Sequence, residues 1–422
     1  MKINSLELVN FRGITKMPLT FSARTTALVG INGVGKSSVL DALAIALSNL
    51  TARVMGQATK ARSMSKDDIR LGSDYARLLV NADLGEDSAT VWAVALNRKA
   101  GKHPADRSSD LTALNARASL FESRLLYWEQ IGGPISLPLA VYYDVHRAVL
   151  DVPLRTRDSG KSSPRDAYND ALGYGGTDFR GFFTWFRNQE DAENERIRDE
   201  PDYRDKGLTA VRRAIEQFTK FTDLRIRRKQ GLRMTVNKAG TELNVMQLSD
   251  GERCMLALVG DLARRLSLLN TENDDPLLGE GVVLIDEIDL HLHPLWQRTV
   301  VSGLERAFPN CQFIITTHSP QVIGELAAES VMLLKEGVFL GHPERSLGLD
   351  SGEVLEELMG GQARNKEVDE ELQVIRHAID DDELPHAKSL LDKLKVRVGN
   401  IPDVQEAQSA IDSLNWLGDD KL

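Results

Sequence analysis

The chain has 422 residues, of which 42% are hydrophobic and 27% charged, a balance typical of a soluble globular protein with two to three domains. Its net charge of −10 argues against a constitutive, nonspecific DNA binder, because such proteins carry a basic balance. The two cysteines have no metal-ligand spacing, and so few of them predict a reduced, cytoplasmic protein. The N-terminus has no apolar signal region, and no run of 18 apolar residues occurs, so no membrane partner is expected.

The first 47 residues predict strands that lead into a phosphate-binding loop. Residues 2–9 alternate imperfectly between polar and apolar side chains, as an edge or second strand does, and residues 19–21 and 25–29 continue the predicted strands. Residues 38–47 are mostly apolar helix formers. Between them, Gly30-Ile31-Asn32-Gly33-Val34-Gly35-Lys36-Ser37 is a complete G-x-x-x-x-G-K-[ST] motif. In such a loop, backbone N–H groups surround the phosphates, the lysine reaches the β- and γ-phosphates, and the serine hydroxyl binds magnesium. The helix that follows directs its positive end at the same phosphates.

Beyond the loop, the apolar pattern predicts two more strands, a long helix, a buried strand and then a helical region. The strands are expected over residues 76–84, 89–96 and 138–144, and the helices over residues 111–130, 187–199 and 208–221. Five aromatic side chains between Phe179 and Phe186 are interpreted as hydrophobic core, with a nucleobase-stacking platform as the alternative. A hairpin and a short third strand are expected over 223–246, and they carry the basic run 225–229, which fits a solvated sheet face or, alternatively, a phosphate-contacting edge.

A second anion site is predicted from Leu248-Ser249-Asp250-Gly251-Glu252-Arg253, which precedes a helix over 254–269. The serine and the glycine stand at the beginning of that helix, where backbone N–H groups have no partner within the helix and bind a negative charge. Alone, the hexapeptide is a weak signal, and its weight comes from the two segments that follow it.

Two buried strands are expected to end in polar residues that complete the site. The apolar run 282–285 predicts a parallel strand followed by Asp286 and Glu287, which suit a magnesium ion and the activation of water. Because neighbouring residues of a strand point to opposite sides, these two carboxylates are expected to face apart. The run 312–317 predicts another buried strand, and the His318 side chain at its end is expected to hydrogen-bond the γ-phosphate.

The order of these motifs resembles the heads of ABC-type ATPases: a phosphate loop, a Ser-x-Gly signature, an Asp-Glu strand and a histidine switch. The lead-in Leu6–Gly13 and the stretch Ile285–Pro294, whose last five residues fall in the D-loop position, are similar to the RecF, SMC and OLD branch rather than to transporters. Within that branch, residues 185–191 and the helical tail resemble PtuA, the stand-alone ATPase of Septu-type and retron-linked anti-phage defence systems. The matching motifs run from residue 1 to about residue 340.

The resemblance implies an α/β fold class, namely a P-loop NTPase with an ABC-type ATPase head, an antiparallel β-subdomain, a helical lobe and a C-terminal helical domain. Residues 1–144 are expected to form the first part of the nucleotide-binding core with the β-subdomain, and residues 145–222 a helical lobe insertion. Residues 223–342 are expected to complete the core with the signature, the Asp-Glu strand and the histidine switch. Residues 343–422 are expected to form a helical domain for docking or oligomerisation.

The resemblance also implies roles for single residues. Catalysis is assigned to Lys36, Glu287 and His318, magnesium to Ser37 and Asp286, and ATP binding to Arg12, Asn32, Gly33, Val34, Gly35, Lys36, Ser37, Ser38, Ser249, Gly251 and Asp286. Lys36 is expected to contact only the ligand. The signature differs from the transporter sequence Ser-Gly-Gly-Gln by two acids, Asp250 and Glu252, which are expected to weaken phosphate binding or make it depend on magnesium. With no evident Q-loop glutamine, the loop 144–147 is expected to substitute for it.

The implied function is hydrolysis of ATP by a head-to-tail homodimer that closes around two ATP and regulates a separate effector, an HNH nuclease, in anti-phage defence. A higher oligomer and binding of DNA or RNA stay open, and the alternative function is a RecF-like repair ATPase that binds DNA itself. Residues 100–246 lack the heptads of SMC arms, and the roughly 80 residues after 340 are too few for an OLD nuclease domain. That tail has the apolar spacing of amphipathic helices, which are expected to dock a partner or to cap the core.

Overall fold

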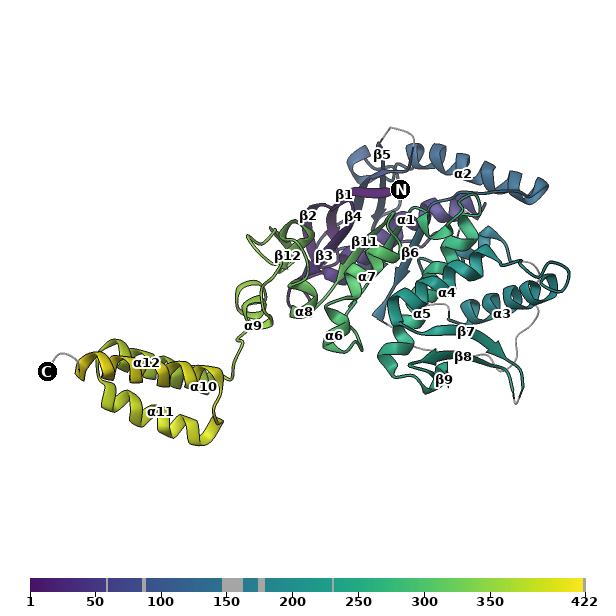
Figure 1. Cartoon of the computed structure of the whole chain (residues 1–422). Helices are drawn as coiled ribbons and strands as arrows, with labels where there is room; N and C mark the ends of the chain where they lie inside the picture. Colours follow the sequence, from purple (N-terminus) through teal and green to yellow (C-terminus); the bar gives the residue numbers. More distant parts are fainter. Residues whose placement is uncertain (58–59, 86–88, 146–161, 174–178, 230, 420–422) are drawn as a thin grey trace. The chain divides into compact units, whose positions relative to one another are not determined.

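The structure, a computed structural model, describes residues 1–422 except 58–59, 86–88, 146–161, 174–178, 230 and 420–422. The chain forms two compact units, residues 1–349 and residues 350–422, each of which is described by itself (Figure 1). Within the described ranges, each helix is too short or too polar to cross a membrane.

The core of the first unit is a six-stranded sheet with the strand order β13-β12-β3-β11-β10-β6. Its strands are β3 (Thr25–Val29), β6 (Leu139–Tyr143), β10 (Gly281–Ile285), β11 (Cys311–Thr316), β12 (Val331–Lys335) and β13 (Val338–Gly341). All neighbouring pairs are parallel except β12 with β13. β3, β6, β10 and β11 are buried at every residue, which explains their nearly continuous apolar sequences, because both faces of a parallel sheet are covered. The carboxyl ends of β3, β11 and β10 therefore lie side by side at one edge of the sheet.

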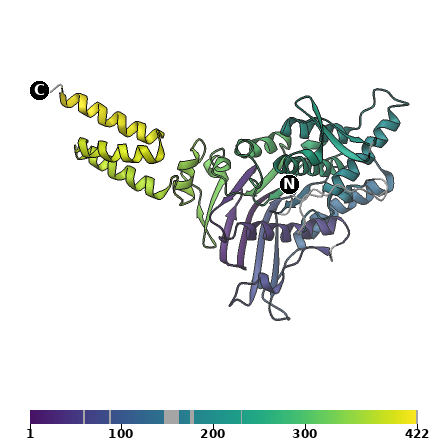
Figure 2. The same ribbon diagram turned by 90° about the horizontal axis from the view of Figure 1, so that it is seen from below.

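A buried helix joins this sheet to a second, antiparallel one, which is seen from below in Figure 2. Helix α1 (Lys36–Val54) packs against β6, β10 and β11 and also against β1 and β4. The second sheet has the order β2-β1-β4-β5, with β1 (Lys2–Phe11), β2 (Ile14–Thr20), β4 (Tyr75–Asp83) and β5 (Ala89–Asn97). Along most of β4, fully buried residues alternate with partly exposed ones, as in an antiparallel sheet with one covered face. Helix α2 (Thr112–Ile131) packs against α1 and β5.

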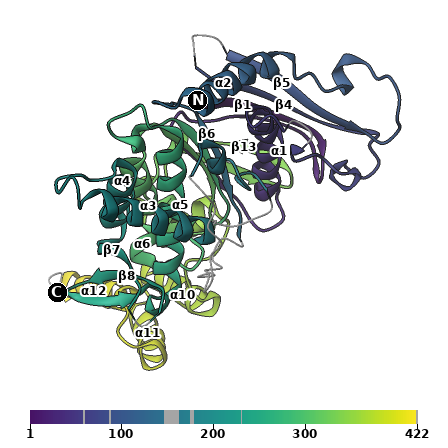
Figure 3. The same ribbon diagram turned by 90° about the vertical axis from the view of Figure 1, so that its right-hand side faces the viewer.

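The helical lobe surrounds α5 (Asp250–Leu269), which is buried from Cys254 to Leu269 and packs against α3 and α4 (Figure 3). Helix α3 spans Phe179–Arg196 and α4 spans Lys206–Thr219. The five aromatic residues of α3 are at most 5% exposed, so their interpretation as hydrophobic core is confirmed and the stacking platform is wrong. After α4 comes a three-stranded sheet of β7 (Thr222–Arg227), β8 (Arg233–Lys238) and β9 (Thr241–Asn244). Three short helices follow strands of the core sheet: α6 (Pro294–Gln297) and α7 (Val300–Ala307) follow β10, and α8 (Pro320–Ile323) follows β11.

A buried ionic cluster ties α5 to the end of β6. The Asp261 carboxylate is fully buried and accepts hydrogen bonds from Arg264 Nη2 at 2.7 Å, Arg265 Nε at 2.8 Å and the Tyr143 hydroxyl at 3.0 Å. Burial raises the pKa of Asp261, but the two guanidinium groups outweigh that effect and bring its pKa below the usual value. The carbonyl of Tyr143 in turn accepts the N–H of Asp286 at 2.9 Å, which joins the cluster to the predicted site.

The second unit is a small helical domain with its own core, and it begins at residue 350 rather than at the expected 343. After α9 (Ser351–Glu353) and a π-helical turn (Val354–Leu358) come α10 (Lys366–Asp380), α11 (Leu384–Val398) and α12 (Pro402–Asp419). The core residues of the last three helices are Leu372, Ile375, Ala378, Ala387, Leu391, Leu394, Val404, Ala407 and Ile411. Residues 350–422 contain 18 acidic and 8 basic residues, which leaves residues 1–349 with 44 of each.

Candidate nucleotide site

The predicted phosphate loop connects β3 to α1. Gly33 and Gly35 adopt left-handed backbone conformations, with φ of 82° and 106°, which other residues rarely adopt. At Gly30 a Cβ atom would lie 2.3 Å from a carbonyl oxygen of β12, so only glycine fits. Lys36 is 6% exposed, and its Nζ donates to the carbonyl oxygens of Gly30 at 2.8 Å and Ile31 at 3.0 Å. The expectation that Lys36 contacts only ligand is therefore wrong, because the ammonium also braces the loop itself.

The other loop residues predicted to bind ATP differ in their exposure. Asn32, Gly33 and Ser37 are exposed, Gly35 and Ser38 are half-buried, and Val34 is buried. Exposed backbone and hydroxyl groups at the beginning of α1 are accessible to a phosphate, whereas Val34 supports the loop from beneath.

The two predicted carboxylates follow β10, but not as consecutive residues of a strand. β10 ends at Ile285, and Glu287 has a φ of 47°, in the left-handed region. The expectation that strand pleating separates Asp286 from Glu287 therefore fails, because the chain has already left the strand. Instead, the Thr316 hydroxyl donates to Asp286 Oδ1 at 2.5 Å and accepts the Glu287 N–H at 2.7 Å. The parallel register, with Ile285 opposite Ile315, places Thr316 beside the two acids.

His318 follows β11 at the same edge of the sheet. The backbone N–H of His318 donates to Asp289 Oδ1 at 3.4 Å, and the Thr317 hydroxyl donates to the same oxygen at 2.6 Å. Burial lowers the pKa of His318 below its usual value, and the ammonium of Lys36 lowers it further. The carboxylates that follow β10 act in the opposite direction and raise this pKa, but by less. Burial likewise lowers the pKa of Lys36, and it outweighs the same carboxylates, which raise that pKa. The structure thus brings the lysine, the histidine and the acids from three separate segments close enough for their charges to affect the pKa values of Lys36 and His318.

The signature stands at the beginning of α5, where its serine takes part in a capping box. The Ser249 Oγ accepts the Glu252 N–H at 3.4 Å, and the Glu252 carboxylate accepts the Ser249 Oγ–H at 2.9 Å. The two acids expected to disfavour a phosphate both have cationic partners within the chain. Glu252 pairs with Lys238 at 2.5 Å, and Asp250 pairs with Arg253. Their negative charges are therefore partly compensated at this helix end.

The signature packs directly on the loop at the D-loop position, residues 290–294. A Cβ atom on Gly251 would lie 2.5 Å from the carbonyl oxygen of His291, so a larger residue would displace that loop. Gln297 then joins the loop to the histidine switch: its Nε2 donates to a carbonyl oxygen of the loop at 2.9 Å, and its Oε1 accepts the Ser319 hydroxyl at 2.8 Å. The signature, the D-loop segment and the switch therefore form one packed structure.

Comparison with known proteins gives the family. The family described as "AAA domain, putative AbiEii toxin, Type IV TA system" matches residues 106–324, and the one described as "AAA ATPase domain" matches residues 1–99. The chain is 32% identical to the Retron Ec83 probable ATPase of Escherichia coli, over 85% of this chain and 76% of that protein. The chain belongs to the AAA-type ATPase family that the first of these two models describes.

Two further relatives of this ABC-type ATPase agree with the predicted resemblance. The Retron Vc95 probable ATPase of Vibrio cholerae serotype O1 biovar El Tor is 28% identical over 80% of this chain and 74% of its own length. The Septu protein PtuA of Bacillus mycoides strain KBAB4 is 25% identical over 79% of this chain and 40% of its own length. The predicted kinship with retron ATPases and PtuA, the P-loop ABC-type fold and the activity, hydrolysis of bound ATP, are thereby confirmed.

Arg12 of this ATPase is held by two carboxylates. Its Nε donates to Asp68 Oδ1 at 2.9 Å, and its Nη1 donates to Asp41 Oδ2 at 2.5 Å. Asp41 belongs to α1, a little more than one turn beyond the phosphate loop, so Arg12 braces the helix that carries Lys36. Its contact with nucleotide stays a prediction.

The basic run 225–229 has partners within the chain. Three of its arginines pair with acids: Arg225 with Asp223, Arg227 with Glu242 and Arg228 with Asp191. The arginine side chains are 42%, 37% and 52% exposed, as expected of a solvated face. These pairings favour the solvated sheet face over a phosphate-contacting edge.

Sequence reasoning missed the residues that hold the site together, namely Thr316, Asp289 and Gln297. The available signal was weak: two threonines directly before the histidine and a second aspartate after the Asp-Glu pair. In the loop expected to replace the Q-loop, Asp144 is 8% exposed, whereas residues 146 and 147 lie outside the described residues.

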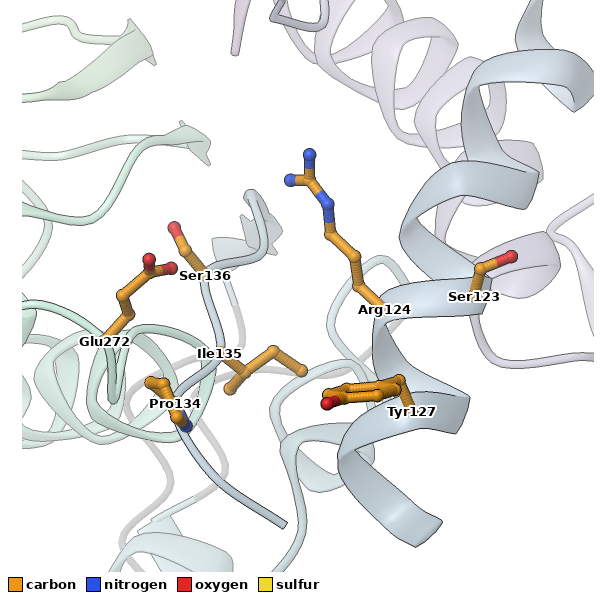
Figure 4. Close-up of a pocket in the computed structure, with 7 residues that line it drawn as sticks. All are labelled: Ser123, Arg124, Tyr127, Pro134, Ile135, Ser136 and Glu272. Carbon is orange, nitrogen blue, oxygen red and sulfur yellow. The ribbon is translucent and has the colours of Figure 1, made fainter. Parts of the chain in front are cut away.

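A pocket of about 520 Å³ lies elsewhere, between α2 and the segment that leads to β6 (Figure 4). Arg124 and Tyr127 of α2 project toward the side of Ile135 and Ser136, with Glu272 beyond them. None of the residues predicted to bind ATP lines this pocket, so it is separate from the nucleotide site.

Proposed function

We propose that this ATPase works as a head-to-tail dimer that closes around two ATP and thereby controls a separate effector, an HNH nuclease, in anti-phage defence. The observation that carries the proposal is the meeting of the phosphate loop, the Asp286–Glu287 turn and His318 at the carboxyl ends of three adjacent strands, β3, β10 and β11. Ligands of open α/β sheets bind at this edge.

Each group has a role that its chemistry supports. Lys36 would bind the β- and γ-phosphates, Glu287 would orient the attacking water, and His318, with its pKa lowered, would approach the γ-phosphate as a neutral imidazole. Phosphoryl transfer depends on positioning and on stabilisation of charge, so the exact arrangement of these side chains decides the rate.

Ser37 and Asp286 suit magnesium, because hydroxyl and carboxylate oxygens are the ligands that this ion prefers. In the part of the chain that the structure describes, no group of three or more His, Cys, Asp or Glu side chains could hold a metal ion. A magnesium shell therefore needs phosphate oxygens and water in addition to these two residues, as expected of a metal that arrives with ATP. When bound, the ion would neutralise charge on the phosphates.

The head-to-tail dimer is supported by the position of the signature. Ser249 is exposed and caps the beginning of α5, where the first backbone N–H groups of the helix lie. A second copy would therefore offer these groups, together with the end of α5, to the phosphates held by Lys36. Control of an effector is supported by the relatives named as retron ATPases and as Septu PtuA.

Mixing two inactive variants tests the shared site. Lys36→Ala removes ATP binding from the loop, and Ser249→Arg blocks the signature, so either homodimer should fail to hydrolyse ATP. In a mixed head-to-tail dimer, one site combines the intact loop of one chain with the intact signature of the other, and phosphate release should return. The matched control mixes Lys36→Ala with Glu287→Gln, which lie in the same half of the site, and should stay inactive. Failure of the first mixture, with both variants folded, would contradict the dimer.

A further inference from the structure

The Thr316 hydroxyl makes two hydrogen bonds that define its chemistry. Thr316 is fully buried at the end of β11. A carboxylate can only accept and an N–H can only donate, so the hydroxyl gives its single proton to Asp286 Oδ1 at 2.5 Å and accepts the Glu287 N–H at 2.7 Å. One oxygen therefore serves two adjacent acids, and it does so as donor to one and acceptor to the other.

This contact stabilises a backbone conformation that is costly by itself. Glu287 lies at a φ of 47°, in the left-handed region, where a residue other than glycine brings its Cβ atom too close to the backbone carbonyl oxygen. Such conformations persist only where the surrounding structure fixes them, and they concentrate at functional sites. Around Glu287 the fixing bonds are its own N–H to the Thr316 hydroxyl, the Ile288 N–H to the Thr316 carbonyl at 3.0 Å, and the Leu290 N–H to the Glu287 carbonyl at 2.9 Å.

We propose that Thr316 is a positioning residue for ATP hydrolysis, whose hydroxyl sets the direction of the Asp286 carboxylate and the conformation of Glu287 at once. The inference rests on the proposed roles of Asp286 and Glu287. Thr316 itself acts only through the two acids. A displacement of the water-orienting carboxylate by about 1 Å is enough to cost about a hundred-fold in rate.

Other bonds between the same segments do not use the hydroxyl, so its removal is expected to shift the two acids without unfolding the turn. The backbone bond from Ile288 to the Thr316 carbonyl does not depend on the side chain. A second crosslink between the same two segments also stays, because Asp289 accepts the Thr317 hydroxyl at 2.6 Å. Valine has the shape of threonine, so Thr316→Val removes the two hydrogen bonds and leaves the volume filled.

The test compares Thr316→Val, Thr316→Ser and Thr25→Val in the full-length protein. Thr25 is a matched control: it is 2% exposed, and its hydroxyl donates to the Glu305 carboxylate at 2.7 Å, but it stands at the beginning of β3, away from the site. Phosphate release gives kcat and KM, and a titration gives ATP affinity. Thr316→Val should lower kcat by about ten- to a hundred-fold with KM unchanged, the range found when partners of site ligands are removed. Thr316→Ser should restore most of kcat, and Thr25→Val should keep it.

A double variant separates this inference from the proposed function. Adding Thr316→Val to Glu287→Gln should lower kcat by a smaller factor than Thr316→Val does in the native chain, because the part of its effect that acts through Glu287 is already lost and effects of residues that work as a unit are not additive. A full further loss in the double variant, or equal loss in Thr316→Val and Thr25→Val, would overturn the inference. Normal turnover of Glu287→Gln by itself would overturn the proposed role of Glu287 instead.

Discussion

Replacing Asp261 by asparagine should destabilise the head strongly, although asparagine has the same size. The carboxylate lies between two guanidinium groups whose side chains are only 4% and 1% exposed, and it also accepts the Tyr143 hydroxyl. With the negative charge removed, Arg264 and Arg265 keep their positive charges in a region that water does not reach. Removing one partner from such a buried pair costs about 3–5 kcal/mol, which is a fifth or more of the roughly 5–15 kcal/mol that stabilises a typical domain.

Urea unfolding followed by circular dichroism measures the effect, and the midpoint should fall by on the order of 1 M. The matched control is Asp274→Asn, because Asp274 pairs with Lys206 at 3.0 Å but is fully exposed. Exposed pairs contribute about 0–1 kcal/mol, so this variant should unfold close to the native chain. Equal midpoints for Asp261→Asn and Asp274→Asn would refute the reasoning that burial makes this cluster expensive to break.

The same cluster predicts the direction of the pH dependence. Since the folded pKa of Asp261 lies below its usual value, its contribution to stability is fully present above the unfolded pKa of about 3.9 and is lost as the pH falls through the folded pKa. The difference in unfolding free energy between the native chain and Asp261→Asn should therefore be largest at neutral pH and should shrink in acid. A difference that grows in acid would show that the carboxylate is not ionised in the folded head.

The remaining predictions concern the ATPase cycle and the second unit. Glu287→Gln should bind ATP normally, because a water-orienting group acts on the transition state, but it should release phosphate very slowly and accumulate a compact dimer with ATP and not with ADP. Light scattering with each nucleotide measures this, and slow turnover without ATP-dependent association would contradict the dimer. Removal of residues 350–422 should leave ATP binding intact and abolish co-purification of the effector or the higher oligomer; if both persist, the second unit is only a cap on the core.

The parts of the site that could be predicted are those in which residue type and spacing carry the chemistry. Gly33, Gly35 and Lys36 were identified because a loop around phosphates needs glycine conformations and an ammonium group at fixed spacing. The buried strands β10 and β11 were predicted from short apolar runs that end in acids and a histidine, since strands covered on both faces are apolar throughout.

What the sequence did not predict depends on contacts between segments distant in the chain. The pairing of Asp286 and Glu287 with Thr316 requires the register of β10 against β11, and no local pattern specifies that register. The left-handed turn at Glu287 was hidden for the same reason, because glutamate has no preference for that conformation and tertiary bonds impose it. Two of the three acids that pair with the basic run 225–229 likewise come from other elements, Asp191 from α3 and Glu242 from β9, and they convert an apparent anion-binding edge into a compensated surface.

The uneven charge of the two units affects how the molecule behaves in solution. Residues 1–349 carry no net charge, whereas residues 350–422 carry a net charge of −10, so the whole net charge of the protein lies in the second unit. A basic molecule is attracted to that unit at a rate that falls as salt is added. A head cut after Leu349 loses this attraction and comes close to its isoelectric point at neutral pH, where mutual repulsion vanishes and proteins associate and precipitate most readily. The acidic helices therefore also act as a colloidal stabiliser for the head that precedes them.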